Sequence, residues 1–270
     1  MTDPVVDFHV HVFPDEIADQ AVPALQARYG LAPRFHPTLS GLQAVCRQQG
    51  VEWAVIQPIA TKPAQVPVIN RWVAGLAGQQ GIKAFGALHP LMTKEEIEQQ
   101  VKELAAHGIK GVKLHAEYQE FYPDDDRLVD LYAILERADM ICLQHAGEDI
   151  GFPPPAKAAP SRLRQVHLGF PRLRLVAAHL GGFRLWPEVE RQLVGLPVWL
   201  DTAFCLEEPL PARLLEIIRA HGAGRILFAT DGPWGDLGRH LRHLRESGLT
   251  TQEIKDIAGR NAYNLLGMPL

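Results

Sequence analysis

Histidine and aspartate residues stand at the ends of several short apolar runs in this chain. The first run closes with the segment Asp7–His11, of sequence DFHVH, and later runs close at His145, His179 and Asp231. Neutral imidazole with carboxylate suits zinc, and also iron(II), manganese or cobalt. No cysteine belongs to the set, which is typical of a catalytic metal site. The residue types therefore predict a bound divalent metal, Zn2+ first and Mn2+ or Fe2+ as alternatives, with Asp7 in a buried hydrogen-bonding role.

The spacing of these residues indicates how they could meet. Side chains at i and i+2 of a strand share a face, and at about 3.3 Å per residue the imidazoles of His9 and His11 can converge on one ion. His145 and Asp231 end two later strands, and parallel barrels build their active sites at that end. The predicted metal ligands are His9, His11, His145 and Asp231. Asp231 is also predicted to be catalytic, with His179 as its catalytic neighbour.

Further polar residues stand at the same ends of other predicted strands. Lys113, His115 and Glu117 belong to or follow the fourth strand. Each of them could be an additional metal ligand, a substrate contact or a plain residue of the barrel mouth. His89 follows the third strand and Asp201 ends the seventh, and we expect both to lie behind the ligands and orient them.

Eight short β-type runs alternate with amphipathic helical stretches along the chain. Several of the runs are continuously apolar, as expected for parallel strands that are covered on both faces. The predicted strands are Val5–Val10, Trp53–Gln57, Lys83–Leu88, Gly111–Leu114, Met140–Gln144, Leu173–Ala178, Val198–Leu200 and Arg225–Ala229. The predicted helices include Leu39–Gln49, Thr93–Ala106, Arg127–Arg137, Pro187–Leu193 and Ala212–His221, with capping boxes at Thr93–Glu96 and Thr250–Glu253.

This alternation fits either a closed parallel barrel or an open doubly wound sheet. No predicted strand is followed by a GxGxxG turn and no Walker A motif occurs, which counts against the nucleotide-binding open sheets. No break in composition marks a linker, and 270 residues is an ordinary length for an α/β barrel. We therefore predict one (β/α)8 TIM barrel domain over residues 1–270.

Composition and charge narrow the class of protein. The formal net charge of -4 and the pI near 6.3 give no electrostatic reason to expect a nucleic-acid partner. Cys46, Cys142 and Cys205 form no CxxC pair, so neither a disulfide framework nor a cysteine metal site is expected. No stretch holds the ~18 uninterrupted apolar residues of a membrane span, and the acidic N-terminus is unlike a signal peptide. We expect a cytoplasmic protein that acts on a small molecule, with homo-oligomerisation left open.

Five segments together resemble the amidohydrolase-related branch of the amidohydrolase superfamily. They are Asp7–His11, Gly111–His115, His145–Gly147, His179–Gly182 and Thr230–Pro233. That branch contains aminocarboxymuconate-semialdehyde decarboxylase and resorcylate decarboxylases alongside hydrolases. The resemblance covers nearly the whole chain, and its motifs are specific for the superfamily and much less so for the reaction.

The resemblance implies the same ligand set, His9, His11, His145 and Asp231, with His179 as the neighbouring catalytic histidine. Some members of the superfamily carry a second metal, bridged by a lysine carbamate or a glutamate of the fourth strand. Lys113 and Glu117 are both present at the fourth strand of this chain. The resemblance is therefore compatible with one or two ions.

Hydrolysis of an amide, ester or lactone is the first expected reaction. A divalent ion lowers the pKa of bound water to roughly 7, and Asp231 would take the proton and pass it to the leaving group. His179 would polarise the substrate carbonyl or stabilise the oxyanion. The alternative is non-oxidative decarboxylation of a small carboxylic acid, with Asp231 and His179 managing protonation at carbon. A third hypothesis is an inactive metal-binding scaffold, whose mark would be a missing ligand or catalytic acid, and neither is missing.

Aromatic residues near the predicted barrel mouth fit a planar substrate, although several of them could simply close the barrel top. They are Phe13, Tyr118, Phe121, Phe152, Phe183, Trp186, Phe204 and Trp234. The loops Tyr118–Asp126 and Phe152–Pro160 are the expected gates over the site.

Overall fold

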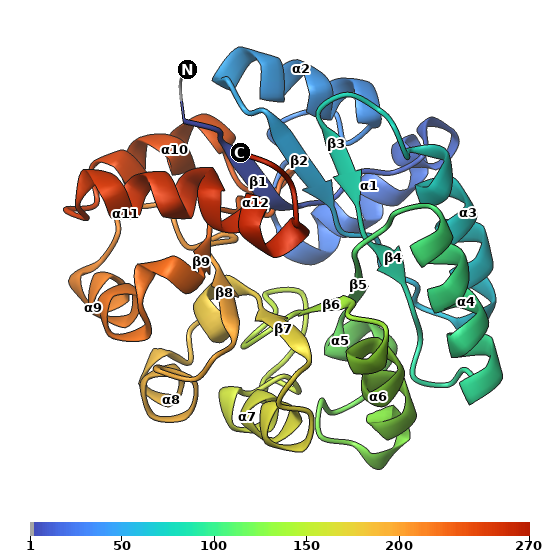
Figure 1. Cartoon of the computed structure of the whole chain (residues 1–270). Coiled ribbons are helices and arrows are strands. Elements are labelled where there is room, and N and C mark those ends of the chain that lie inside the picture. The colour runs from blue at the N-terminus through green and yellow to red at the C-terminus, as the bar shows by residue number, and fades with distance from the viewer. Residues whose placement is uncertain (1–2) are drawn as a thin grey trace.

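Nine strands alternate with helices in the described part of the chain, residues 3–270 of a computed structural model. The strands are β1 (Val6–Val10), β2 (Trp53–Ile56), β3 (Ile82–Ala84), β4 (Gly86–Ala87), β5 (Gly111–Leu114), β6 (Ile141–Gln144), β7 (Arg174–Ala177), β8 (Trp199–Asp201) and β9 (Ile226–Leu227). In Figure 1 the strands stand around a common centre and the helices form an outer layer.

The helices follow the strands in the order that the alternation predicts. They are α1 (Asp15–Tyr29), α2 (Leu39–Gln49), α3 (Val66–Gly75), α4 (Lys94–Ala106), α5 (Ala116–Gln119), α6 (Val129–Arg137), α7 (Pro160–Gly169), α8 (Trp186–Gln192), α9 (Ala212–His221), α10 (Leu237–Arg245), α11 (Thr251–Lys255) and α12 (Asn261–Leu266). Short helical turns are η1 (Pro63–Gln65), η2 (Asp126–Leu128), η3 (His179–Gly181), η4 (Ala223–Arg225) and the π-helical η5 (Asp256–Arg260).

The strands pair in parallel, in the order β1-β2-β3 and β4 through β9. Backbone hydrogen bonds also link β1 to the segment around β9, because Phe8 N–H donates to Phe228 O over 2.9 Å and Asp231 N–H donates to His9 O over 2.9 Å. Parallel strands with helices outside are the architecture of the (β/α)8 barrel. The predicted fold class is confirmed.

The third predicted strand, Lys83–Leu88, is one continuous strand in the prediction and two short strands in the structure. The ladder is interrupted at Phe85, although its N–H still donates to Ile56 O over 2.9 Å. Phe85 packs edge-on against Phe8, with ring centroids 5.6 Å apart. Gly86 lies so close to Leu104 that a Cβ there would stand 2.3 Å from the leucine Cδ1. This local packing against an interior ring and a helix was not visible in the apolar pattern.

The predicted capping boxes are confirmed at both places. Thr93 accepts a hydrogen bond from Glu96 N–H and caps α4, and Thr250 accepts one from Glu253 N–H and caps α11. Helices α2 and α9 have the predicted bounds. The predicted helix Arg127–Arg137 instead begins with the 3-10 turn η2, and α8 starts and ends one residue before its prediction.

The core has an inner and an outer part. Val6 and Phe8 of β1 pack inside the ring of strands, whereas Val10 packs in the cluster between strands and helices. The register of β1 against β2 shifts between Asp7 and Val10. A one-residue shift exchanges the two faces of a strand. The shift therefore brings His9 and His11 to the interior, one layer above Phe8.

Helix α12 covers the barrel end opposite to these histidines. Tyr263 of α12 accepts a hydrogen bond from Trp53 Nε1 at the start of β2, over 3.0 Å. Its ring belongs to the inner cluster together with Leu265 and Leu266. The opposite end, where the strands terminate, is left for the polar residues.

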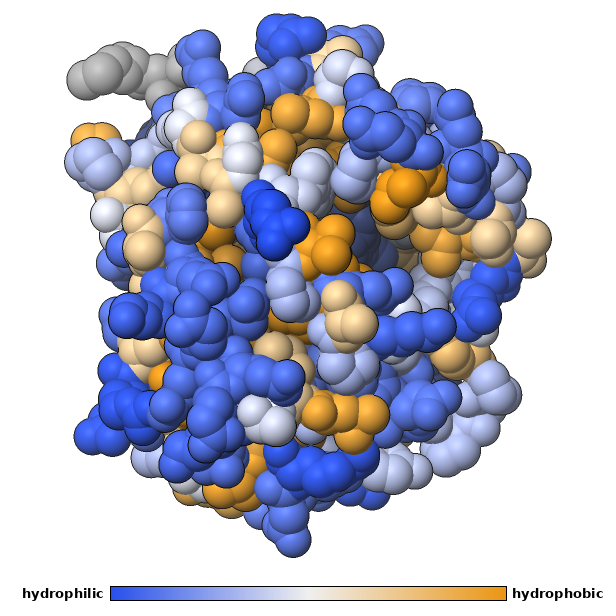
Figure 2. Space-filling model, turned by 90° about the vertical axis from the view of Figure 1, so that its right-hand side faces the viewer, coloured by the Kyte–Doolittle hydropathy of each residue, from blue (hydrophilic) through white to orange (hydrophobic). Residues whose placement is uncertain are grey.

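The helices and one face of the surface were compared with what a membrane span requires. None of the helices within residues 3–270 has both the length and the hydropathy that a membrane span requires. Figure 2 shows one face of the molecule, on which hydrophilic side chains predominate and apolar residues gather only in small groups.

Candidate metal centre

Three of the four predicted ligands meet at the carboxyl ends of β1 and β9. Asp231 Oδ1 lies 3.1 Å from His11 Nε2 and 3.5 Å from His9 Nε2. One donor atom from each of the three residues lies within 4.8 Å of the other two. Two imidazoles and a carboxylate in this arrangement are a donor set that divalent transition metals accept.

Backbone contacts hold this triplet together. Asp231 N–H donates to His9 O, and His11 N–H donates to Gly232 O over 2.5 Å. Asp231 has a left-handed backbone, with φ of 64°. Aspartate tolerates that conformation better than most residues do, at a modest cost in free energy. The positions of the three donors are thus set by two backbone segments, the end of β1 and the segment after β9, which these hydrogen bonds hold side by side.

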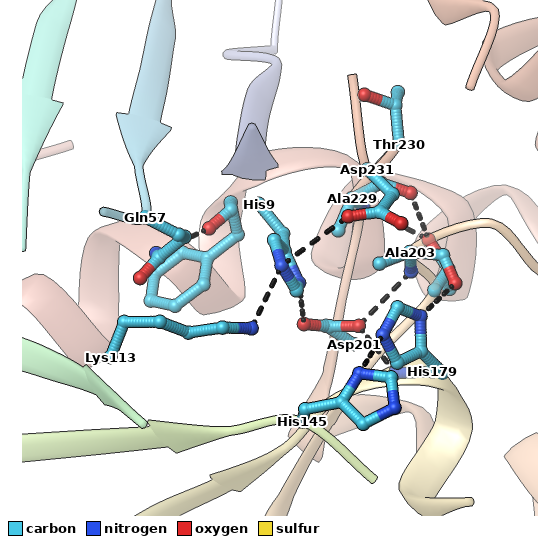
Figure 3. Close-up of polar contacts among 12 residues, drawn as sticks. His9, Gln57, Lys113, His145, His179, Asp201, Ala203, Ala229, Thr230 and Asp231 are labelled. Atoms are coloured by element: carbon cyan, nitrogen blue, oxygen red, sulfur yellow. Dashed lines mark hydrogen bonds and ion pairs between the residues drawn. The ribbon is translucent and has the colours of Figure 1, made fainter. Parts of the chain in front are cut away.

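The hydrogen bonds of the two histidines select the tautomer that a metal needs. His9 Nδ1 donates to Asp201 Oδ2 over 2.9 Å, and His11 Nδ1 donates to Gln57 O over 2.8 Å. A neutral imidazole with its proton on Nδ1 has a free lone pair on Nε2. Both Nε2 atoms face Asp231, as Figure 3 shows for His9. The residues present therefore fit a divalent cation.

Electrostatics favour the same protonation states. Burial and the nearby charge of Lys113 lower the pKa of His9 to about 3, so its imidazole is neutral at pH 7. Burial alone would raise the pKa of Asp231, but contact with the imidazole of His11 and the proximity of His9 and His179 favour the carboxylate and hold its pKa well below the usual value. Neutral imidazoles beside an anionic carboxylate are the ligand forms of these side chains.

Lys113 is the buried cation of the site. Its side chain is 1% exposed, and its Nζ lies 3.0 Å from His9 Nε2, where it can donate to the lone pair (Figure 3). Burial lowers the pKa of Lys113 to about 8. The ammonium thus stands beside the donor triplet.

The fourth predicted ligand, His145, lies next to His179 rather than within the triplet. His179 Nδ1 donates to Ala203 O over 2.9 Å, and His179 Nε2 lies 3.0 Å from His145 Nδ1 (Figure 3). If His179 is neutral, its Nε2 accepts a hydrogen bond from His145 Nδ1–H, and the lone pair of His145 is then on Nε2. That Nε2 is buried and has no hydrogen-bond partner among the described residues. A buried ring nitrogen without a hydrogen-bond partner is expected where a side chain binds a metal ion or a substrate.

His145 also groups with His115 and with Asp149. His115 Nε2 lies 3.2 Å from Asp149 Oδ2, and the rings of His115 and His145 are stacked, with centroids 4.2 Å apart and an interplanar angle of 16°. Imidazole lone pairs lie in the ring plane, so two nearly parallel rings do not point at a common ion. The stacked pair therefore suits hydrogen bonding better than a shared metal.

The remaining predicted residues divide into two groups. Asp201 lies directly behind the site, because it accepts hydrogen bonds from His9 Nδ1 and, over 2.8 Å, from His179 N–H. Glu117 accepts instead from Lys157 N–H over 2.7 Å and does not line the cavity beside the triplet. His89 accepts from Leu91 N–H over 3.2 Å and lies outside that cavity as well.

Asp7 has the buried role that its position predicts. It is 1% exposed and accepts hydrogen bonds from Thr230 Oγ1 over 2.6 Å and from Thr230 N–H over 3.0 Å. Burial raises the pKa of Asp7 to about 7 in spite of these contacts. The hydrogen bonds between Asp7 and Thr230 therefore link β1 to the residue before Asp231.

Two contributors had not been predicted. Gln57 orients His11 through its backbone carbonyl, which no side-chain pattern can indicate. Asp149 follows Gly147 in a loop and carries a signal that could have found it, since it is an acidic residue four positions after His145. Gly147 itself has φ of 86°, and a Cβ there would stand 2.1 Å from Phe183 N. The loop therefore requires glycine at position 147.

A cavity opens from the triplet towards the barrel mouth. It has a volume of about 190 Å3, and Lys113, His115, His145 and His179 form part of its wall. Its aromatic wall residues are Phe13, Tyr29, Tyr118, Phe183, Phe204 and Trp234. Of the aromatic residues predicted at the mouth, Phe121 is 1% exposed in the core, and Trp186 does not line the cavity.

Asp201→Asn is expected to weaken metal binding by about 10- to 100-fold, because the amide no longer holds His9 in the metal-binding tautomer. Titration of the metal-free protein with Zn2+ or Mn2+ against a competing chromophoric chelator measures the affinity. Asp130→Asn, on a side chain that is 60% exposed on α6, is the matched control. Equal affinities for both variants would remove Asp201 from the metal centre.

Solved structures of other proteins share the fold of this chain. A 5-carboxyvanillate decarboxylase from Sphingomonas paucimobilis is 15% identical at a TM-score of 0.75, with 99% of this chain and 100% of that chain covered. An uncharacterised TIM-barrel protein from Bordetella bronchiseptica is 21% identical at a TM-score of 0.79, with 98% of both chains covered. A dihydroxybenzoic acid decarboxylase from Polaromonas, solved with manganese and the inhibitor 2-nitroresorcinol, is 16% identical at a TM-score of 0.74, with 98% and 97% covered.

Identities this low show a common fold, and family membership rests on the sequence itself. No curated protein matches the chain significantly. The amidohydrolase family model, however, matches residues 6–268, which is nearly the whole chain. The predicted resemblance is therefore confirmed, and the chain belongs to the amidohydrolase family of metal-dependent enzymes.

Proposed function

We propose that this protein catalyses the metal-dependent, non-oxidative decarboxylation of a small aromatic carboxylic acid. The observation that carries the proposal is the position of the donor triplet at a cavity whose wall includes six aromatic side chains. The names of the similar structures support it, since they include decarboxylases of 5-carboxyvanillate and of dihydroxybenzoic acids. Hydrolysis, the first expectation from the sequence, is less well supported than this alternative.

His9, His11 and Asp231 would hold the ion, with His145 as the further predicted ligand. A bound divalent ion would supply a localised positive charge for the carboxylate or a neighbouring hydroxyl of the substrate. The ligand set suits zinc and also manganese, and one similar decarboxylase was solved with manganese. Lys113 adds a second positive charge on the same side of the cavity.

The aromatic walls would orient the ring and keep water away from it. Phe183 packs edge-on against Phe204, with centroids 6.0 Å apart, and Trp234 packs edge-on against Tyr29 at 5.2 Å. Edge-on pairs of this kind form rigid apolar surfaces. A planar substrate between them has few orientations, which lowers the entropic cost of reaching the reacting geometry.

The reaction replaces a carboxylate on the ring by a proton. The ring carbon gains the proton, the carbon–carbon bond breaks, its electron pair returns to the ring, and CO2 leaves. Asp231, kept anionic by its neighbours, can take up a proton from a substrate hydroxyl and deliver it to the ring carbon. His179 can exchange a proton with His145 Nδ1 through their 3.0 Å contact. These two residues are our candidates for moving the proton to carbon.

Hydrolysis of an amide, ester or lactone is the second candidate. One observation favours it, which is that the anionic Asp231, 3.1 Å from His11 Nε2, could equally accept a proton from water. A small-molecule substrate is common to both reactions.

Metal removal followed by a product assay tests the proposal. We expect CO2 release from 2,6-dihydroxybenzoate by the Mn2+- or Zn2+-loaded protein, loss of that activity on chelation, and recovery on adding Mn2+. Mass spectrometry of the decarboxylated phenol confirms the product. Ester, lactone and anilide substrates run in parallel, and turnover of those alone would favour the hydrolytic candidate instead.

A further inference from the structure

A second cavity adjoins the one above the donor triplet. The two share six wall residues, Tyr29, Leu31, Glu148, Asp149, Ile150 and Phe204, so they meet along one boundary. The far wall of the second cavity comes from the loop after β6, with Phe152, Pro153, Pro154 and Ala156. A substrate ring in the first cavity would therefore have space beside it that the ring does not fill.

The boundary between the cavities is acidic. Glu148 is one-third exposed, at 34% of its side chain, and Asp149 is nearly buried at 7%. Asp149 Oδ1 accepts a hydrogen bond from Gly151 N–H over 2.7 Å, and its Oδ2 faces His115.

The nearby cations do not cancel this charge. Arg184 lies at the rim with 60% of its side chain exposed, and its guanidinium is 3.9 Å from Glu148 and 5.1 Å from the Phe183 ring centre. Arg28 stacks on Phe152 at 4.8 Å but lines neither cavity. Lys113 is at the base of the first cavity, against His9. A second anionic group that reached into the second cavity would therefore meet the carboxylates of Glu148, Asp149 and Glu117 and one wall cation, Arg184, whose side chain is 60% exposed.

We propose that the two cavities form one bipartite substrate site. The site accepts an aromatic monoacid whose ring carries an uncharged or cationic substituent, and it rejects a substituent that bears a second carboxylate. The proposal rests on the proposed function for the placement of the ring. Like charges at contact distance across a partly solvated boundary weaken binding by about tenfold.

Matched ligands test this proposal by binding rather than by turnover. The probe is 2-nitroresorcinol, which one similar decarboxylase binds as an inhibitor, either bare or with a hydroxyethyl, aminoethyl or carboxyethyl arm para to the nitro group. Calorimetric titration of the Mn2+-loaded protein gives each Kd. We expect the hydroxyethyl and aminoethyl ligands to bind at least as tightly as the bare ring, and the carboxyethyl ligand to bind about tenfold more weakly.

Two variants locate the arm. Ala156→Phe fills the second cavity and should lower the affinity for the hydroxyethyl ligand, relative to the bare ring, by about tenfold. Ala105→Phe adds the same side chain on the exposed side of α4, outside both cavities, and is the control. Glu148→Gln should strengthen binding of the carboxyethyl ligand and weaken binding of the aminoethyl ligand.

The outcomes separate the two proposals. If the bare ring binds, equal affinities for the carboxyethyl and aminoethyl ligands would overturn the bipartite site. So would an unchanged ratio of the affinities for the hydroxyethyl ligand and the bare ring in Ala156→Phe. Failure of every ligand to bind, including the bare ring, would overturn the bipartite site and the proposed function together. If the protein releases CO2 from a monoacid but binds the hydroxyethyl, aminoethyl and carboxyethyl ligands with equal affinity, only the bipartite site is overturned.

Discussion

Asp231→Asn is expected to lower kcat/KM for CO2 release by about 10³-fold, the scale of losing a positioned acid–base group. Asparagine keeps the shape of the side chain and tolerates the left-handed backbone, with φ of 64° at this position. The substitution therefore removes a negative charge and a proton acceptor with little other change. Steady-state release of CO2 and the metal content of the purified variant are the measurements.

The chain offers a closely matched control for this substitution. Asp139 also has a left-handed backbone, with φ of 51°, and its side chain is 82% exposed at the surface, where it contacts Arg174. Asp139→Asn should leave kcat/KM and metal content unchanged. If Asp231→Asn behaved like this control, Asp231 would be neither a ligand nor a proton carrier.

His179→Asn is expected to lower kcat by about 10²- to 10³-fold while the protein still binds its metal. The variant loses the contact with His145 and the hydrogen bond to Ala203 O, but His9, His11 and Asp231 keep their contacts with one another. Asparagine also accepts the backbone φ of 56° at this position. Parallel measurement of kcat and of metal affinity by chelator competition distinguishes a catalytic role from a ligand role.

His107→Asn, at the exposed C-terminal end of α4, is the control for the loss of an imidazole. It should match the unmodified protein in both measurements. Loss of metal from His179→Asn in step with the loss of activity would make His179 a ligand, contrary to the prediction.

Much of the fold could be predicted from local patterns because parallel strands buried on both faces give apolar runs of a recognisable length. The ends of those runs then placed His9, His11 and Asp231 at one rim, and the structure brings these three together. The interruption of the third strand at Phe85 could not be predicted, since it depends on Phe8 and Leu104, which are distant in the sequence.

The orientation of the side chains at the rim could not be predicted from the sequence. His145 ends its strand where the pattern indicates, but the direction of its ring depends on His179 and on the stacked His115. Glu117 follows the fourth strand as expected and then hydrogen-bonds to the backbone of Lys157. Periodicity locates a residue along a strand, and only tertiary contacts decide which neighbour its side chain meets.

One carboxylate on β8 connects two functions of the site. Asp201 holds the imidazole of His9 through one oxygen and the backbone of His179 through the other. Displacement of either partner would change the hydrogen-bonding geometry of the other, so we expect ion binding at His9 and ligand binding at His179 to share a coupling free energy. Thermodynamic linkage makes such an effect reciprocal. A ligand that draws His179 towards it will change the affinity for the ion by the same factor by which the ion changes the affinity for that ligand.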